Sequence, residues 1–271
     1  MALWDKIGSR GNVDDRRGLR SAGGLSITGV LLLVGVTYLM GGDPLAVLTQ
    51  IDPSAFEVQT TSTEETAEFA GEDSYELFVS QVLGSLDDMW AREFTKSAKI
   101  YQKNELVLFR GRTQSACGGA SEVVGPHYCP NDEKIYLDET FFNELTERLG
   151  AKGGDVAEAY VIAHEAGHHV QHQLGTLDSG ADSIQVELQA DCFAGMWAHS
   201  LRDQSIFAPG EIAEAMDAAA SVGDDRIQER MEGTVQPETW THGSSAARVE
   251  AFTLGYEEGS LKECLSYTEG R

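Results

Sequence analysis

Positively charged residues are scarce in this 271-residue sequence. Lys and Arg together number 20, against 44 Asp and Glu, and the formal net charge is -24. Binding to the phosphate backbone of DNA or RNA requires clustered Lys and Arg. The shortage of such residues therefore argues against a nucleic-acid partner, although it says little about the fold.

Charge of either sign is absent from residues 21–42, SAGGLSITGVLLLVGVTYLMGG, and no Lys or Arg occurs between Arg20 and Arg92. About 20 apolar residues in a helix cross the core of a bilayer, so this segment predicts a transmembrane helix. The positive-inside rule then places residues 1–20 in the cytoplasm and the later residues outside it, in the periplasm or the extracellular space. A cleaved signal peptide and a buried helix are the alternatives.

Cysteine is also sparse, with four residues and no C-x-x-C pair of the kind found in zinc knuckles. An even number of cysteines in an exported domain suggests two disulfides. Cys117 and Cys129 flank a Gly-rich loop and can close it locally, which leaves Cys192 to pair with Cys264. Four free, buried thiols are the alternative.

The remainder of the chain shows no internal repeat and divides into a linker and one domain. Residues 43–72 are rich in Thr, Glu and Ala and are typical of a linker, and the folded domain is expected to begin near Asp73. Asp155 is the expected N-cap of one helix. Apolar periodicity predicts helices over residues 74–97, 139–150, 155–174, 184–203, 209–231 and 246–259, and strands over 105–111 and 135–138. A helix-rich order with a small sheet predicts an α+β domain over residues 73–271.

The helix predicted over residues 155–174 contains the motif H-E-x-x-H, in which His164, Glu165 and His168 are the fixed residues. His164 and His168 are four residues apart and therefore project from one face of the helix. Two imidazole nitrogens on one face can bind the same Zn²⁺, each at roughly 2.0–2.1 Å. Glu165 is placed to act as general base on a zinc-activated water. The motif is a signature of zinc proteases, but it supplies only two of the three protein ligands.

The third ligand is expected on the next helix, in the segment ELQAD. Glu187 and Asp191 are again four residues apart on one face. Glu187 completes a site of two His and one Glu with an open fourth position, and Asp191 orients a ligand histidine by accepting its other ring N–H. Burying these polar groups without partners would be costly, and a shared zinc ion removes that cost. Glu158 is a weaker candidate for the third ligand, and pairing of the two carboxylates with arginines is the alternative.

The loop TWTHGSS precedes the last helix and contains His242, the candidate donor that stabilises the oxyanion formed during peptide hydrolysis. Arg248 is the second candidate, and the alternative is a simple capping loop in which Ser244 or Ser245 is the N-cap.

The other histidines of this region, His169 and His172, are expected to lie outside the site. The predicted strand over residues 135–138 is the expected sheet edge with which an extended substrate pairs.

These motifs together resemble the bacterial YpfJ-like family of neutral zinc metallopeptidases. The segments that carry the resemblance are NVDDRRG, CGGASEVVGPHYCPNDEKIYLDETFF, AYVIAHEAGHHVQ, ELQADCFAGMWAH, GDDRIQ and THGSSAARVEAFTLGYEEG. The resemblance implies a membrane-anchored protein with a zincin-like catalytic domain, in which His164 and His168 bind zinc and Glu165 is catalytic. Glu187 follows from the wider gluzincin-like pattern of two His ligands and one Glu ligand.

The sequence thus predicts a membrane-anchored zinc metalloendopeptidase that acts on a peptide or protein substrate and holds one catalytic Zn²⁺. The first alternative is a zinc-stabilised extracytoplasmic binding or scaffold module that cleaves nothing. The second is a metal-free interaction protein anchored in the membrane.

Overall fold

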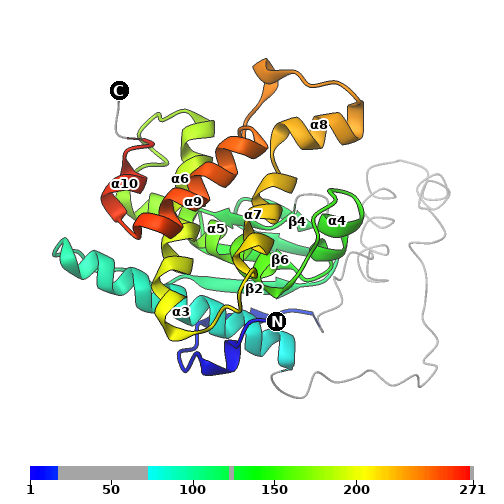
Figure 1. Ribbon diagram of the computed structural model, residues 1–271. Coiled ribbons are helices and arrows are strands. Elements are labelled where there is room, and N and C mark those ends of the chain that lie inside the picture. The colour runs from blue at the N-terminus through cyan, green and yellow to red at the C-terminus, as the bar shows by residue number, and fades with distance from the viewer. Residues whose placement is uncertain (18–72, 122–124, 269–271) are drawn as a thin grey trace, which may run out of the picture. The chain divides into compact units, whose positions relative to one another are not determined.

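The computed structural model describes residues 1–17, 73–121 and 125–268, and these form an α+β arrangement of helices around a small sheet (Figure 1). The strands are β1 (Asn12–Asp15), β2 (Glu105–Phe109), β3 (Arg112–Ser115), β4 (Gly118–Ser121), β5 (His127–Cys129) and β6 (Lys134–Asp138). The α-helices are α3 (Ser74–Lys96), α4 (Phe141–Glu147), α5 (Asp155–Leu174), α6 (Ser183–Leu201), α7 (Ile212–Ser221), α8 (Asp224–Glu232), α9 (Ser245–Glu258) and α10 (Leu261–Leu265). The expected α+β class is therefore confirmed.

The main sheet has the strand order β1-β2-β6-β5, and β3 pairs with β4 in a separate hairpin. β1 and β6 run parallel to β2, whereas β5 runs antiparallel to β6. The prediction that residues 135–138 form the sheet edge was wrong, because β6 lies between β2 and β5. The free edge on this side belongs to β5, a three-residue strand that the sequence analysis did not identify.

Helix α3 begins at Asp73, whose side chain accepts hydrogen bonds from the backbone N–H groups of Tyr75 and Glu76 at 3.1 and 2.8 Å. Such a cap satisfies amide groups that have no partner within the helix. The helix then buries a long apolar stripe that includes Leu83 and Trp90. Helix α3 therefore begins where the sequence predicted a helix to begin.

The first residues of the chain pack into the same compact unit as the residues from Asp73 onward. Trp4 is buried and stacks on Trp197 with 6.3 Å between ring centroids. The backbone N–H of Ala2 and the indole N–H of Trp4 both donate to Asp155, at 2.8 and 2.7 Å. Asp155 therefore lies in the first turn of α5 and holds the N-terminus, while Gly154 occupies the N-cap position that was expected for Asp155.

Arg17 is the last described residue of the N-terminal segment, and its guanidinium group is buried. Arg17 forms ion pairs with Asp15, Asp73 and Glu139 at 2.7, 3.1 and 2.8 Å. This arrangement differs from the expected separate cytoplasmic segment over residues 1–20, because Met1–Arg17 supply a strand and core residues to the domain.

No helix among the described residues is long and apolar enough to cross a membrane. The transmembrane helix expected over residues 21–42 and the linker expected over 43–72 lie outside the described residues.

Both expected disulfides are present. Cys117 pairs with Cys129, and Cys192 pairs with Cys264. The Cys117–Cys129 disulfide joins the turn between β3 and β4 to β5. The Cys192–Cys264 disulfide joins α6 to α10.

Candidate metal centre

The candidate site is built on α5 and α6. The two helices approach each other closely at Gly167, inside the H-E-x-x-H motif. A Cβ atom at Gly167 would lie 3.2 Å from backbone atoms of Ala190, so a larger residue would push the helices apart. Gly175 ends α5 in the left-handed conformation with φ of 79°, which allows the chain to turn back toward α6. The polar faces of the two helices therefore meet.

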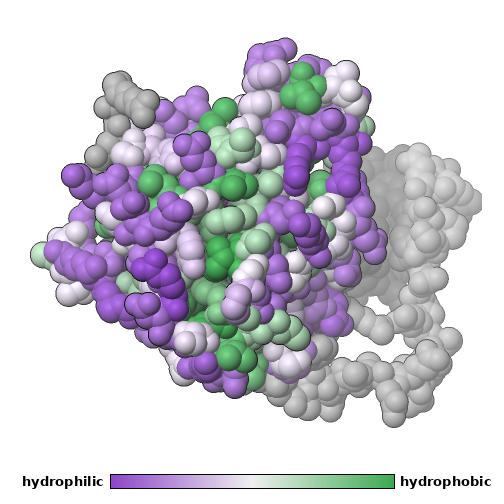
Figure 2. All heavy atoms as spheres, viewed as in Figure 1, coloured by the Kyte–Doolittle hydropathy of each residue, from purple (hydrophilic) through white to green (hydrophobic). Residues whose placement is uncertain are grey.

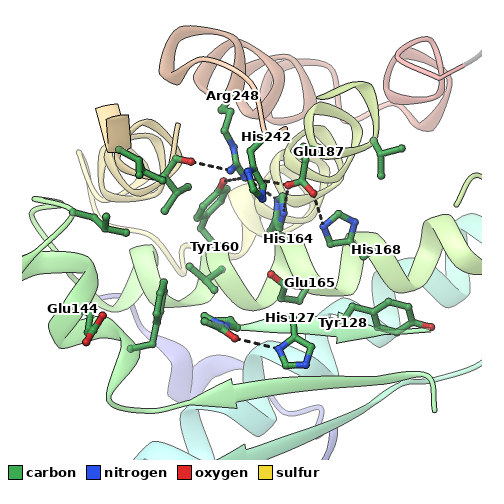
Figure 3. Close-up of a pocket in the computed structure, with 18 of the residues that line it drawn as sticks. His127, Tyr128, Glu144, Tyr160, His164, Glu165, His168, Glu187, His242 and Arg248 are labelled. Carbon is green, nitrogen blue, oxygen red and sulfur yellow. Dashed lines mark hydrogen bonds and ion pairs between the residues drawn. The ribbon is translucent and has the colours of Figure 1, made fainter. Parts of the chain in front are cut away.

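Three side chains converge at this meeting point (Figure 3). The ligand atoms of His164, His168 and Glu187 all lie within 4.8 Å of one another. His164 Nε2 is 3.1 Å from Glu187 Oε2, and His168 Nε2 is 3.5 Å from Glu187 Oε1. Two ligands of a tetrahedral zinc ion, each at roughly 2.0–2.1 Å from the metal, are about 3.3 Å apart. The three residues therefore fit a zinc ion.

The other ring nitrogen of each histidine is held by an oxygen atom. His164 Nδ1 lies 2.8 Å from Asp191 Oδ1, and His168 Nδ1 lies 2.8 Å from Gln171 Oε1. Because each oxygen accepts a hydrogen bond, Nδ1 carries the proton and donates it, which leaves the lone pair on Nε2 for a metal. Asp191 thus lies where the sequence predicted, whereas Gln171 was missed, although its place three residues after His168 on the same helix was a usable signal.

The carboxylates give the centre a strongly negative potential. Burial lowers the pKa of His164, but Asp191 and Glu187 outweigh burial and raise the pKa to about 10. Burial raises the pKa of Glu187, but His168 and His164 outweigh it and hold the pKa well below its usual range. The two carboxylates therefore favour positive charge at this point.

The side chain of Arg248 is buried and contacts Asp191, the residue that holds His164. Arg248 donates from Nε to Asp191 Oδ2 at 2.8 Å and from a terminal nitrogen to Asp191 Oδ1 at 3.0 Å. The hydroxyl of Tyr160 donates to the same carboxylate at 2.5 Å. Arg248 therefore neutralises and fixes the group that orients His164. The sequence analysis considered Arg248 only as an oxyanion donor and did not identify this contact or the role of Tyr160.

Glu165 is the remaining residue of the motif. Its side chain is buried at 8% exposure and lines a pocket of about 780 Å³ beside the three ligand residues. None of the hydrogen bonds or ion pairs found among the described residues involves this carboxylate. In Figure 3 it lies between His164 and His127. Glu165 is therefore free to act on a molecule that enters the pocket.

His242 also lines the pocket, on the α9 side of the metal centre, with a half-exposed side chain. Its backbone N–H donates to Asp224 at 2.7 Å, and its Nδ1 lies 3.3 Å from the same carboxylate. Ser244 rather than Ser245 is the cap of α9, since its hydroxyl accepts from the N–H of Ala247.

The remaining histidines of α5 lie outside the centre, as expected. His169 is fully buried and hydrogen-bonded to the carbonyl of Gln102 at 2.7 Å, and His172 contacts the hydroxyl of Tyr128 at 2.8 Å. Glu158 is not part of the three-residue cluster.

The chain is similar to known proteins over nearly its whole length. A family model described as "Putative neutral zinc metallopeptidase" matches residues 2–267. The chain belongs to this zinc metallopeptidase family. The uncharacterized protein YpfJ of Escherichia coli K12 is 36% identical over 97% of this chain and 98% of its own length.

A second relative of this chain is a mycobacterial protein. The uncharacterized protein Rv2575 of Mycobacterium tuberculosis H37Rv is 42% identical over 62% of this chain and 64% of its own length. No solved structure matches the chain. The match to the family includes the N-terminal segment as well as the metal centre, in keeping with the packing of both into one unit.

Proposed function

We propose that this protein is a zinc-dependent metalloendopeptidase in which His164, His168 and Glu187 hold one Zn²⁺. The observation that carries the proposal is the convergence of these three ligand atoms beside a buried carboxylate that has no partner of its own among the described residues. When bound, zinc acts as a Lewis acid that makes water more acidic and polarises a carbonyl group.

Glu165 is the general base of the reaction. It takes a proton from the attacking water as the water oxygen forms a bond to the carbonyl carbon of the substrate. It then delivers that proton to the amide nitrogen as the carbon–nitrogen bond breaks. His242 lines the same pocket and donates a hydrogen bond to the oxyanion formed from the carbonyl oxygen.

The substrate is a peptide or protein segment in extended conformation. The free edge of β5 carries His127 and Tyr128, both of which line the pocket. An extended chain can add to such an edge through backbone hydrogen bonds. β5 therefore takes the role that the sequence analysis gave to β6.

The domain acts outside the cytoplasm and is anchored through residues 21–42. The two disulfides support the location, because disulfides persist in oxidising compartments. The uncharged, apolar composition of residues 21–42 supports the anchor. Met1–Arg17 pack into the domain and therefore lie on the same side of the membrane as the domain. A single pass through the bilayer over residues 21–42 would separate the two, so the proposed anchor is not a single-pass helix.

Cleavage of a peptide library by the zinc-loaded full chain tests the proposal, with Glu165→Gln as the critical variant. This variant keeps the metal ligands and loses the base, so we expect normal zinc content and a loss of nearly all turnover. Glu257→Gln changes the same chemical group on the exposed surface of α9 and is expected to leave turnover unchanged.

Full turnover by Glu165→Gln would contradict the assigned role of this residue. Zinc binding without any cleavage by the wild-type protein would instead favour the scaffold module.

A further inference from the structure

Helix α8 presents an apolar pair to the pocket instead of to the core. Its sequence, DDRIQERME, contains only two apolar residues, Ile227 and Met231. They are four residues apart and therefore lie on one face. Both line the pocket, and no residue of α8 is buried in the core. Met231 is 61% exposed. An apolar stripe on a surface helix normally packs against the core of its own domain, so this pair lacks its usual partner.

The pair faces other apolar side chains across the same pocket. We call the whole group the apolar wing, and it consists of Phe141, Leu149, Val161, Val222, Ile227 and Met231. These residues come from α4, α5, α8 and the segments that follow α4 and α7. Glu144 and Arg148, which form an ion pair at 2.9 Å, add a polar rim.

The apolar wing is continuous with the proposed catalytic centre. Val161 lies one helical turn before Glu165 on α5 and lines the same cavity. In Figure 3, Tyr160 and Glu144 lie on one side of His164, and His168 and Tyr128 lie on the other. Val161 follows Tyr160 in the sequence, so the apolar wing includes a residue of the metal-binding helix itself and lines the same pocket as the metal centre.

We propose that the apolar wing is a specificity subsite that binds a large aliphatic or aromatic side chain beside the bond to be cut. The assignment rests on the proposed peptide hydrolysis, because its occupant is part of the chain that is cleaved. The subsite is one part of the pocket of about 780 Å³ that also contains the metal centre, and this pocket falls within the roughly 300–1,000 Å³ of ligand sites. Large apolar side chains are mostly buried in folded proteins, so the subsite selects unfolded or extended segments.

Peptide binding to the zinc-loaded full chain carrying Glu165→Gln tests the subsite without turnover. The probes are blocked peptides Gly-Gly-X-Gly-Gly, with Leu, Phe, Ala, Lys or Glu at X, measured by titration calorimetry. We expect Leu and Phe to bind at least about tenfold more tightly than Ala, since burial of apolar surface favours binding.

Adding Ile227→Lys to this background should abolish the preference for the Leu and Phe peptides over the Ala peptide. The added positive charge should also make the Glu peptide bind more tightly. Glu229→Gln changes the net charge by the same amount at an exposed position of α8, and it should keep the preference. Met231→Lys at the more exposed position of the pair provides a second variant, and zinc content together with far-UV circular dichroism verifies folding.

Equal affinity for all five peptides, no binding of any of them, or an unchanged preference in both Lys variants would overturn the subsite. Cleavage of the same peptides by the wild-type protein separates the two proposals. Cleavage without a preference for Leu or Phe would overturn the subsite and leave the peptidase function standing. Preferential binding without cleavage would support the subsite and contradict the peptidase function.

Discussion

His242 is the residue whose proposed role is most open to a direct kinetic test. It lines the pocket but makes no contact with the three ligand residues among the interactions described above, and Asp224 holds its backbone and ring. Removal of one oxyanion donor typically lowers kcat by about 10²–10³. We expect His242→Ala to show a loss of that order with unchanged zinc content, measured by steady-state kinetics. A variant with wild-type kcat would exclude His242 as the donor.

Glu158 gives a prediction for the pH dependence of stability. Burial raises its pKa from 4.5 to about 7, an effect that Tyr75 lessens. The folded protein therefore holds a proton that the unfolded chain has lost above pH 4.5. The contribution to stability is present below pH 4.5 and is lost as the pH rises through about 7. Each pKa unit corresponds to about 1.4 kcal/mol, so the contribution is at most about 3.5 kcal/mol.

Glu158→Gln removes this titration. We expect the free energy of unfolding to fall less between pH 5 and pH 8 in the variant than in the wild-type protein, as measured by urea denaturation. Glu257→Gln on the exposed surface is the matched control and should follow the wild type. Identical pH profiles for Glu158→Gln and the wild type would show that Glu158 does not titrate in this range.

At this scale the sequence predicted the three side chains that converge, His164, His168 and Glu187, but did not predict most of the side chains that hold them. His164, Glu165 and His168 share one motif, and the four-residue spacing of Glu187 and Asp191 was enough to place both near it. Arg248 could not be assigned in this way, because its contact with Asp191 spans 57 residues and depends on how α9 packs against α6.

At the scale of elements, α6 and α9 pack through two glycines. A Cβ atom at Gly195 would lie 2.0 Å from the carbonyl oxygen of Phe252, and one at Gly255 would lie 1.9 Å from that of Cys192. These contacts bring the α9 backbone close enough for Arg248 to reach Asp191. The close approach of the two helices therefore supports the metal centre.

Gly195→Ala should force these helices apart. Overpacking of this kind commonly costs about 1–3 kcal/mol, and we expect such a loss in the free energy of unfolding together with weaker zinc binding. Gly8→Ala is the matched control, because a Cβ atom there meets nothing within 4 Å. A stable Gly195→Ala variant with normal zinc affinity would show that the α6–α9 contact can relax without affecting the centre.

Helices with long apolar stripes were predicted closely, and α5 coincides with its predicted range. The strands β1, β3, β4 and β5 were missed because each has only three or four residues, and the pairing of β1 also depends on distant residues. β1 has only four residues, and Asn12 pairs with Glu105, more than ninety positions away. No local periodicity distinguishes such a strand from a loop.

At the scale of the whole molecule, the packing of Met1–Arg17 bears on membrane topology. The sequence analysis placed residues 1–20 and the domain on opposite sides of a membrane by charge alone. A segment that supplies Trp4, β1 and Arg17 to the domain lies on the same side of any membrane as the domain, whereas the single-pass helix predicted over residues 21–42 would separate the two. The positive-inside rule describes a tendency of short flanking segments and does not consider whether they fold into a distant domain.

Labelling of single added cysteines in intact cells tests this placement. Leu3→Cys and Glu257→Cys both lie at exposed positions, and the four native cysteines are held in disulfides. With a membrane-impermeant maleimide, we expect both added cysteines to react to the same extent. Reaction of Glu257→Cys alone would place the N-terminus across the membrane, whereas reaction of neither before lysis would place the domain in the cytoplasm.

Zinc content of the purified full chain is the most direct test of the account as a whole. The geometry predicts about one zinc per wild-type chain, the same content in the exposed-surface variant Glu257→Gln, and a sharp reduction in Glu187→Gln, which removes the charge that joins the two histidines. A wild-type chain that takes up no zinc on titration, or a Glu187→Gln variant that binds zinc as tightly as the wild type, would contradict the proposed centre.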